Sequence, residues 1–241
     1  MNVLIITGAS KGIGKGIAEY YSSKDYLVYS LSRTKSGLSP IEEVEVDVTE
    51  LELACKKLNY ILHKIDFSVV EKITFINNAG RLGKISNLGN LEPTDIELSI
   101  KLNTTVPLVL SNAFINATKD LDVEKQIINI SSGAAVSPYT GWSVYCTSKA
   151  AIDMMTKTIA TEQSDMKYGV KCVSIYPGVV DTNMQDQIRS TSVSDFKNVE
   201  RFKELKSSNQ LYNPIFVGQR IYELDHEGVL QNGDIIDIRH N

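Results

Sequence analysis

The chain has 241 residues, of which 42% are hydrophobic and 22% are charged, and its formal net charge is −4. These values are typical of a globular protein with one sizeable core, so a single domain over 1–241 is expected. The negative charge favours neither nucleic acid nor an anionic membrane as a partner. The first residues lack the basic start and long apolar stretch of a signal peptide, and no later stretch is expected to cross a bilayer. We therefore expect a cytoplasmic protein.

Short apolar runs alternate with helical patterns along the whole chain. Buried parallel strands are expected at 2–7, 26–31, 43–48, 72–77, 125–131, 170–177 and 233–238. Helical patterns lie between them, at 12–24, 50–64, 94–118, 142–162 and 214–227. This alternation predicts an α/β fold, a single doubly wound (Rossmann) domain with a parallel sheet of about seven strands and helices on both faces.

The segment 184–212, "MQDQIRSTSVSDFKNVERFKELKSSNQLY", is polar and contains no predicted strand. It follows the carboxyl end of the strand at 170–177, and ligands bind at that edge of such sheets. We expect a mobile flap over a substrate site. The alternative is a helical insert that is merely solvated.

The cysteines and histidines indicate neither disulfides nor a metal site. Cys55, Cys146 and Cys172 are odd in number and form no CxxC motif, which suits a reducing compartment. Cys146 has no histidine nearby in sequence to activate it, so a structural role is the simpler interpretation. The three histidines are scattered without ligand spacing, so no metal is expected.

A glycine-rich turn, "TGASKGIG" (7–14), lies between the first strand and the first helix. Gly8, Gly12 and Gly14 let the backbone turn tightly and approach a pyrophosphate, whose charge would lie at the helix N-terminus. The spacing is G-x3-G-x-G rather than the commoner G-x-G-x2-G. A glycine-rich turn alone is weak evidence, but its place between a strand and a helix indicates a dinucleotide site.

The sequence "YCTSK" (145–149) places Tyr145 four residues before Lys149, on one face of the helix predicted at 142–162. The spacing alone is equally compatible with an ordinary helical pair. The usual pKa of tyrosine, about 10, makes it a poor acid–base group near neutrality. A neighbouring ammonium would lower that pKa by favouring the phenolate, so the pair is a candidate proton donor and its tuning cation.

With these motifs the chain resembles the short-chain dehydrogenase/reductase family, whose cofactor turn is TGxxxGxG. The resemblance covers nearly the full chain and implies an NAD(P)-dependent oxidoreductase that acts on CH–OH and C=O groups. The family's other signatures occur in its order: "DV" (47–48), "NNAG" (77–80), "ISS" (130–132), "YCTSK" (145–149), and "PG" (177–178) followed by Thr182.

The strand predicted at 26–31 runs on into "SRT", without the carboxylate that an NAD site uses for the ribose hydroxyls. Arg33 and Lys11 supply cations where a 2′-phosphate would lie, which favours NADP(H). The alternative is that both are solvated surface charges. Asn77 is expected to join strands rather than touch the cofactor. From the turn and the resemblance, the candidate cofactor-binding residues are Gly8, Ser10, Lys11, Gly12, Ile13, Gly14, Arg33, Asp47, Val48, Asn78, Ala79, Gly80, Tyr145, Lys149, Pro177, Gly178, Val180 and Thr182.

The resemblance also assigns the catalytic groups. Tyr145 would donate the proton, and Lys149 would lower the pKa of Tyr145 and hold the nicotinamide ribose. The family's serine stands thirteen residues before the tyrosine, which selects Ser132 over Ser131 to bind the substrate oxygen. The alternative for both serines is that they satisfy backbone groups at a strand end.

Asn103, in "IKLNTTVP", matches the family's asparagine that anchors a water between Lys149 and solvent. The alternative is a buried residue at a helix kink near Pro107. With Asn103, Ser132, Tyr145 and Lys149 all present, an active enzyme is expected rather than an NADPH-binding sensor or scaffold.

The stretches "YPGVVDTNMQ" (176–185) and "SSNQLYNP" (207–214) resemble the branch that contains sepiapterin reductase and benzil reductases. This implies an NADPH-dependent reductase of one carbonyl of a small vicinal diketone such as benzil, giving a hydroxyketone. The alternatives are a sepiapterin-type or a 3-oxoacyl thioester reductase, although the ending "LQNGDIIDIRHN" lacks the paired glycines usual in the thioester enzymes.

The resemblance further implies a homodimer or homotetramer, paired through the helices at 94–118 and 142–162. An apolar substrate pocket near Tyr145 is also expected, although its candidates could equally be ordinary packing or subunit contacts. Those candidates are Val136, Tyr139, Trp142 and Met184.

Overall fold

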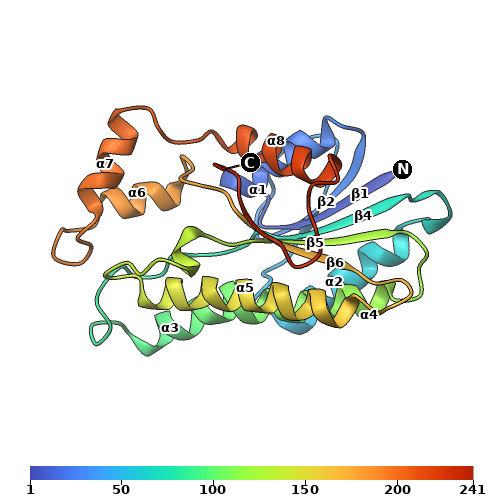
Figure 1. Ribbon diagram of the computed structural model, residues 1–241, viewed down its shortest axis with the longest axis horizontal. Coiled ribbons are helices and arrows are strands. Elements are labelled where there is room, and N and C mark those ends of the chain that lie inside the picture. The colour runs from blue at the N-terminus through green and yellow to red at the C-terminus, as the bar shows by residue number, and fades with distance from the viewer. Residues whose placement is uncertain (241) are drawn as a thin grey trace.

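A computed structural model describes residues 1–240, and its centre is a seven-stranded parallel sheet in the order β3-β2-β1-β4-β5-β6-β7 (Figure 1). The strand order reverses between β1 and β4, which opens a crevice at the carboxyl ends of these strands. The predicted doubly wound sheet is confirmed. The strands are β1 (Asn2–Thr7), β2 (Tyr26–Ser32), β3 (Ile41–Glu45), β4 (Lys72–Asn77), β5 (Glu124–Ile130), β6 (Lys171–Tyr176) and β7 (Ile235–Asp237).

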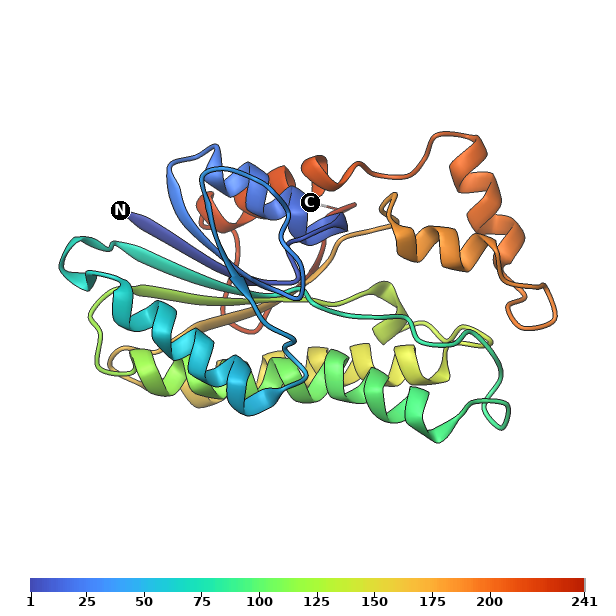
Figure 2. The same cartoon turned by 180° about the vertical axis from the view of Figure 1, so that it is seen from behind.

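Helices cover both faces of the sheet (Figures 1 and 2). Because both faces are buried, neighbouring strand residues such as Ile5 and Ile6 enter different cores, which explains the continuous apolar runs of the sequence. On one face lie α1 (Gly12–Ser22) and α8 (Pro214–His226); on the other lie α2 (Leu51–Lys64), α4 (Val106–Thr118) and α5 (Ser143–Gln163).

The helix predicted at 94–118 is interrupted near its middle. It consists of α3 (Pro93–Ile100), a π-helical turn η2 (Lys101–Thr105), and α4. Within residues 1–240 this run is the one helix long and apolar enough to cross a membrane by length and composition, although the sequence suggested none. Phe114 of α4 is fully buried and stacks on Phe75 of β4, with ring centroids 5.4 Å apart. The apolar face of α4 therefore belongs to the core.

The third strand begins and ends earlier than the sequence predicted. β3 spans Ile41–Glu45, whereas the alternation in "EVEVDV" predicted 43–48. Thr49 donates to Asp47 Oδ1 from its backbone N at 2.9 Å and from its Oγ1 at 2.8 Å, and this turn leads the chain away from the sheet. Val48 is nevertheless buried in the core, which is why the apolar pattern extends past the strand.

The segment 184–212 contains α6 (Asn183–Arg189) and α7 (Val199–Ser207), which project beyond the end of the sheet opposite the N-terminus (Figure 1). Four of its apolar side chains are buried with Trp142 and Tyr145 in a separate small core. The alternative of a merely solvated insert is therefore wrong for them. They are Ile188, Phe196, Val199 and Phe202.

Candidate active site

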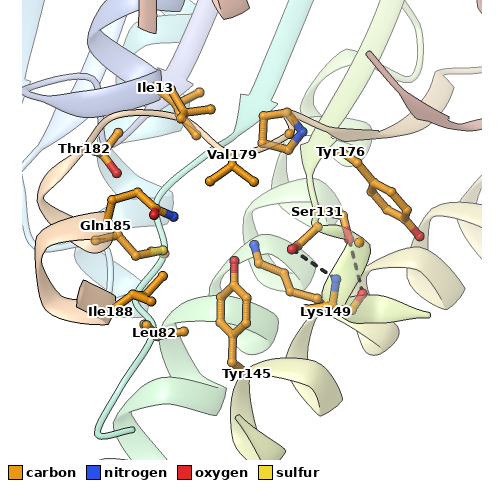
Figure 3. A pocket seen from close by; sticks show the side chains of 18 of the residues that line it. Ile13, Leu82, Ser131, Tyr145, Lys149, Tyr176, Val179, Thr182, Gln185 and Ile188 are labelled. Atoms are coloured by element: carbon orange, nitrogen blue, oxygen red, sulfur yellow. Dashed lines mark hydrogen bonds between the residues drawn. The ribbon is translucent and has the colours of Figure 1, made fainter. Parts of the chain in front are cut away.

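One pocket, with a cavity of about 160 Å³, lies at the carboxyl edge of the sheet (Figure 3). Its walls come from the chain that follows β4, β5 and β6, from α5, and from α6 and α7. These segments are distant in sequence, and the parallel sheet brings them together because all its strands end at this edge. Tyr145 and Lys149 lie on one side of the pocket, and Thr182 and Gln185 lie across from them (Figure 3).

The glycine turn is held tightly against the end of β4. Asn78 Nδ2 donates to the carbonyl oxygens of Thr7 and Gly8, at 2.9 and 3.0 Å. A Cβ on Gly14 would lie 2.3 Å from Asn78 Nδ2 and 2.4 Å from the Gly8 oxygen, so no larger residue fits there. Gly8 and Gly12 have φ of +73° and +57°, a region that glycine adopts without strain.

The N-terminus of α1 has free hydrogen-bond donors. Lys11 at the N-cap makes no side-chain cap, and the first turn contains no acidic residue. The first backbone N–H groups of a helix have no intrahelical acceptor, and together with the helix dipole they favour an anion. A glycine cradle followed by an uncapped helix start fits the pyrophosphate of a dinucleotide.

The ends of β2 and β3 lie beside this turn. Ala9 N donates to Ser32 Oγ at 2.9 Å, which joins the turn to the end of β2. Arg33 is exposed and, like Lys11, forms no ion pair among residues 1–240. Burial raises the pKa of Asp47, but hydrogen bonds within its own turn and the nearby charge of Arg33 outweigh burial and leave that pKa lowered. The residues predicted for the adenosine end of the cofactor, Lys11, Arg33 and Asp47, therefore lie near one another beside the glycine turn.

Tyr145 is 8% exposed and points into the pocket from α5 (Figure 3). Burial raises the pKa of its hydroxyl to about 12, against the smaller opposing effect of a hydrogen bond with the Ser132 side chain. The lowered pKa that the sequence predicted for Tyr145 is therefore not found here. Desolvation of the phenolate is the larger effect, and at neutral pH the hydroxyl keeps its proton.

Lys149 is 6% exposed, and its Nζ lies 5.7 Å from the centroid of the Tyr145 ring. The ammonium donates to the carbonyl oxygen of Ile130 at 2.7 Å. Burial lowers the pKa of Lys149 to about 8, partly opposed by the charge of Asp153 one turn further along α5. Asp153 in turn accepts hydrogen bonds from Ser174 Oγ at 2.9 Å and from the Tyr176 hydroxyl.

The two serines after β5 have different partners. Ser131 is buried and donates to the Lys149 carbonyl oxygen at 3.4 Å, so it satisfies the backbone as the alternative expected. Ser132 Oγ accepts from Ala134 N at 3.2 Å, and the Ser132 side chain partly opposes the rise in the pKa of Tyr145. Both serines line the pocket and both bond a backbone group, so the choice of Ser132 over Ser131 stays a prediction.

Asn103 lies in the π-helical turn, fully buried, and its amide is held at both ends. Arg81 N donates to Asn103 Oδ1 at 2.9 Å, and Asn103 Nδ2 donates to the Arg81 carbonyl at 2.8 Å and to Ser148 Oγ at 3.1 Å. A Cβ on Gly80 would lie 3.4 Å from Asn103 Oδ1 and 3.9 Å from Lys149 Nζ. Asn103 and Lys149 therefore approach the same glycine from two different helices.

The candidate residues fall into two groups. Ile13, Asn78, Gly80, Ser132, Tyr145, Lys149, Pro177, Gly178, Val180 and Thr182 line the pocket. Gly8, Ser10, Lys11, Gly12, Gly14, Arg33, Asp47, Val48, Ala79 and Asn103 lie outside its lining. Asn77 joins strands as expected, since its Nδ2 donates to Asn129 Oδ1 on β5 at 2.8 Å and to Ser111 Oγ on α4 at 3.0 Å.

The apolar wall of the pocket is the part that the sequence reveals least. Tyr139, Trp142 and Met184 line it as suggested, but Val136 does not and is 73% exposed. The Trp142 ring stacks on the buried Phe196, with centroids 4.7 Å apart and planes 8° from parallel. Further lining residues that were not among the candidates include Arg81, Leu82, Val179, Gln185, Ile188, Arg201, Phe202 and Arg239. Only the aromatic residues within the polar stretch 184–212 hinted at this wall.

Comparison with known proteins identifies the class of protein. A family model described as short chain dehydrogenase matches residues 2–193. The chain therefore belongs to the short-chain dehydrogenase/reductase family and is an oxidoreductase. Within this family it falls in the branch of the benzil and sepiapterin reductases.

Three proteins illustrate the similarity. A benzil reductase of the (S)-benzoin-forming type from Bacillus subtilis (strain 168) is 40% identical over 99% of both chains. A sepiapterin reductase from Meriones unguiculatus is 30% identical, over 99% of this chain and 97% of that protein. The crystal structure of a short chain dehydrogenase/reductase from Saccharomyces cerevisiae superposes with a TM-score of 0.84 at 24% identity, over 99% of this chain and 96% of that one, which supports the fold.

Proposed function

We propose that this protein is an NADPH-dependent carbonyl reductase that converts one carbonyl of a small vicinal diketone, such as benzil, into a hydroxyl. The observation that carries the proposal is the convergence of Tyr145, Ser132 and Lys149 on one pocket that is also lined by the rings of Tyr139, Trp142 and Phe202. An aromatic diketone needs both an apolar wall for its rings and a hydrogen-bond donor for its oxygen. The similarity to benzil reductases supports the same substrate class.

The bound cofactor would supply the hydride, and the residues of the chain would handle the proton. The Tyr145 hydroxyl, protonated at neutral pH, would donate to the carbonyl oxygen as negative charge develops there. Ser132, which lines the same pocket as Tyr145, would bind the same oxygen through its Oγ. The Lys149 ammonium would stabilise the phenolate that forms and hold the nicotinamide ribose. Asn103 would keep the π-helical turn and the chain after β4 in register beside Lys149.

The choice of NADPH over NADH depends on Arg33 and Lys11, two exposed cations beside the glycine turn. Replacing Arg33 by Ala should raise the KM for NADPH about tenfold or more, because a charge-assisted hydrogen bond to a phosphate contributes about 1.5–3 kcal/mol. The KM for NADH should change little. Lys35→Ala is the control, since Lys35 is also exposed and lies two residues further along the chain. An equal effect on both cofactors would contradict this assignment.

The reaction is tested by NADPH oxidation with benzil, other α-diketones, sepiapterin and acetoacetyl thioesters. We expect the fastest turnover with the diketones. Rapid turnover of the thioester alone would refute the substrate class. Tyr145→Phe keeps the ring but removes the proton donor, and kcat should fall by about 10²–10⁴-fold with NADPH binding retained. A sensor or scaffold would instead bind NADPH without reducing any carbonyl, and the substitution would then change nothing.

Assembly and the segment 184–212 complete the proposal. Leu108 on α4 and Met154 on α5 expose more than half of their surface, which supports a dimer formed through these two helices. Light scattering of the purified protein, with Leu108→Asp as the disrupting variant, tests this pairing.

We further propose that α6 and α7 close over the substrate. Protection of their backbone amides from hydrogen exchange on adding NADPH and benzil would support this closure.

A further inference from the structure

Gln185 lies in the pocket wall without a hydrogen-bond partner. It is 7% exposed and belongs to the first turn of α6, where its backbone N donates to the Thr182 carbonyl at 2.8 Å. Its side-chain Oε1 is buried and unpaired, and no residue within 1–240 bonds its Nε2. Figure 3 shows the amide projecting from α6 into the pocket, on the side opposite Tyr145.

A buried amide in this state is costly. Leaving a buried polar group without a partner costs about 1–3 kcal/mol, and an apolar side chain of similar size would remove that cost. Gln187, by contrast, two residues further along the same helix, is exposed, and its Nε2 donates to the Gly83 carbonyl at 2.7 Å. The unpaired state of Gln185 is thus not general to α6, and it calls for a partner that enters the pocket.

The surroundings indicate what that partner must be. The same pocket is lined by the apolar side chains of Leu82, Ile188 and Phe202, and by three arginines, Arg81, Arg201 and Arg239. Two further residues of the wall carry a buried and unpaired donor, Nε1 of Trp142 and Nη1 of Arg81, whose Nη2 is paired with Asp95. A ligand whose only oxygen is bound at Ser132 and Tyr145 would make no hydrogen bond with the Gln185 amide. A ligand with a second oxygen can reach the opposite wall.

We propose that Gln185 binds the second oxygen of the substrate, the one on the carbon next to the carbonyl that is reduced. The inference rests on the proposed function and narrows its substrate class to vicinally dioxygenated compounds. The Nε2 group donates to the second carbonyl of an α-diketone, and Oε1 accepts from the hydroxyl of an α-hydroxyketone. Gln185 thereby selects such substrates over simple ketones and orients which of the two carbonyls faces Tyr145.

The test compares benzil with 1,2-diphenylethanone, which keeps both rings but lacks the second oxygen. The monoketone is scored as a substrate or, where turnover is slow, as a competitive inhibitor. The variant is Gln185→Met, a near-isosteric change that removes both polar atoms. The control is Asn183→Leu, which removes an amide from an exposed position on the same helix.

We expect Gln185→Met to lower kcat/KM for benzil about tenfold, mostly through KM, because one hydrogen bond to the substrate is lost. In Gln185→Met, the kcat/KM or inhibition constant for the monoketone and the KM for NADPH should stay within about twofold of the unaltered protein. Asn183→Leu should change neither these two constants nor kcat/KM for benzil. An equal loss for both ketones would mean a structural role, and a raised KM for NADPH would mean that the amide serves the cofactor; either overturns the inference. If the unaltered protein reduces no carbonyl at all, the proposed function itself fails.

Discussion

The two sides of the pocket are built in different ways. The side assigned to the cofactor consists of short backbone turns at strand ends, held by hydrogen bonds such as those from Asn78 to the oxygens of Thr7 and Gly8. The side assigned to the substrate is a small core of its own, in which Trp142 packs against Phe196. The first depends on local backbone geometry, whereas the second depends on side chains that meet only after folding.

This difference teaches where each side is vulnerable. A tight turn is disrupted when one atom is added, because its backbone groups are already in contact. A side-chain core is destabilised when atoms are removed, because a cavity remains. Changes on one side should therefore alter binding of one ligand and leave the other ligand's constants intact. Three substitutions and one pH profile test this difference between the two sides, in order of decreasing expected effect.

Phe196→Ala should have the largest effect on stability. Phe196 is fully buried, and removing a buried aromatic ring costs about 3–5 kcal/mol of unfolding free energy. At temperatures where the variant remains folded, KM for benzil should rise while KM for NADPH stays unchanged. Urea unfolding and steady-state kinetics measure both. Phe216→Ala, at a position 41% exposed, is the matched control and should cost much less. An equal rise in the KM for benzil and the KM for NADPH would contradict the separation of the substrate side from the cofactor side.

Gly14→Ala attacks the cofactor side by adding a single carbon. The new Cβ would contact Asn78 Nδ2 and the Gly8 oxygen far inside van der Waals distance, and such overpacking costs about 1–3 kcal/mol. We expect NADPH to bind more than about tenfold more weakly, measured by fluorescence titration. Gly37→Ala is the control: a Cβ there would meet no atom within 4 Å, so the affinity for NADPH should persist.

The pH dependence should report on Lys149. Its pKa of about 8 means that the ammonium is present below pH 8 and is lost above it, so kcat/KM for reduction should fall about tenfold per unit at higher pH. Unfolding should not cause this fall. The unfolded chain keeps that proton up to a pKa of about 10.4, so between these values the unfolded chain binds more protons and this group adds stability as pH rises. A flat profile from pH 7 to 9.5 would contradict the assignment.

Cys146→Ser should have the smallest effect. Burial raises the pKa of the Cys146 thiol, and its Sγ lies 3.8 Å from the Ser137 carbonyl, so it is poorly suited to act as a nucleophile. We expect kcat/KM to stay within about twofold of the unaltered value, and the thiol to react slowly with a chromogenic disulfide. A loss of more than tenfold would place Cys146 in the chemistry.

The sequence determined the class of fold and the chemistry of the core of the site. Period and alternation identified the seven strands and the long helices because both signals are local. They did not locate α6, α7 or the π-helical turn within 94–118, and they displaced β3, which is followed by an aspartate turn. The glycine turn and the Tyr145–Lys149 pair could be recognised in the sequence for the same reason, since each motif consists of a few neighbouring residues.

Tertiary structure alone decided the electrostatics and the substrate side. The pKa of Tyr145 is raised rather than lowered because the degree of burial depends on what packs around α5. The segment 184–212 reads as polar, yet it carries Phe196 and Phe202 into a core with Trp142. The unpaired amide of Gln185 likewise becomes evident only when all its potential partners are in place. Burial and hydrogen-bond satisfaction are properties of the assembled chain, and no local pattern encodes them.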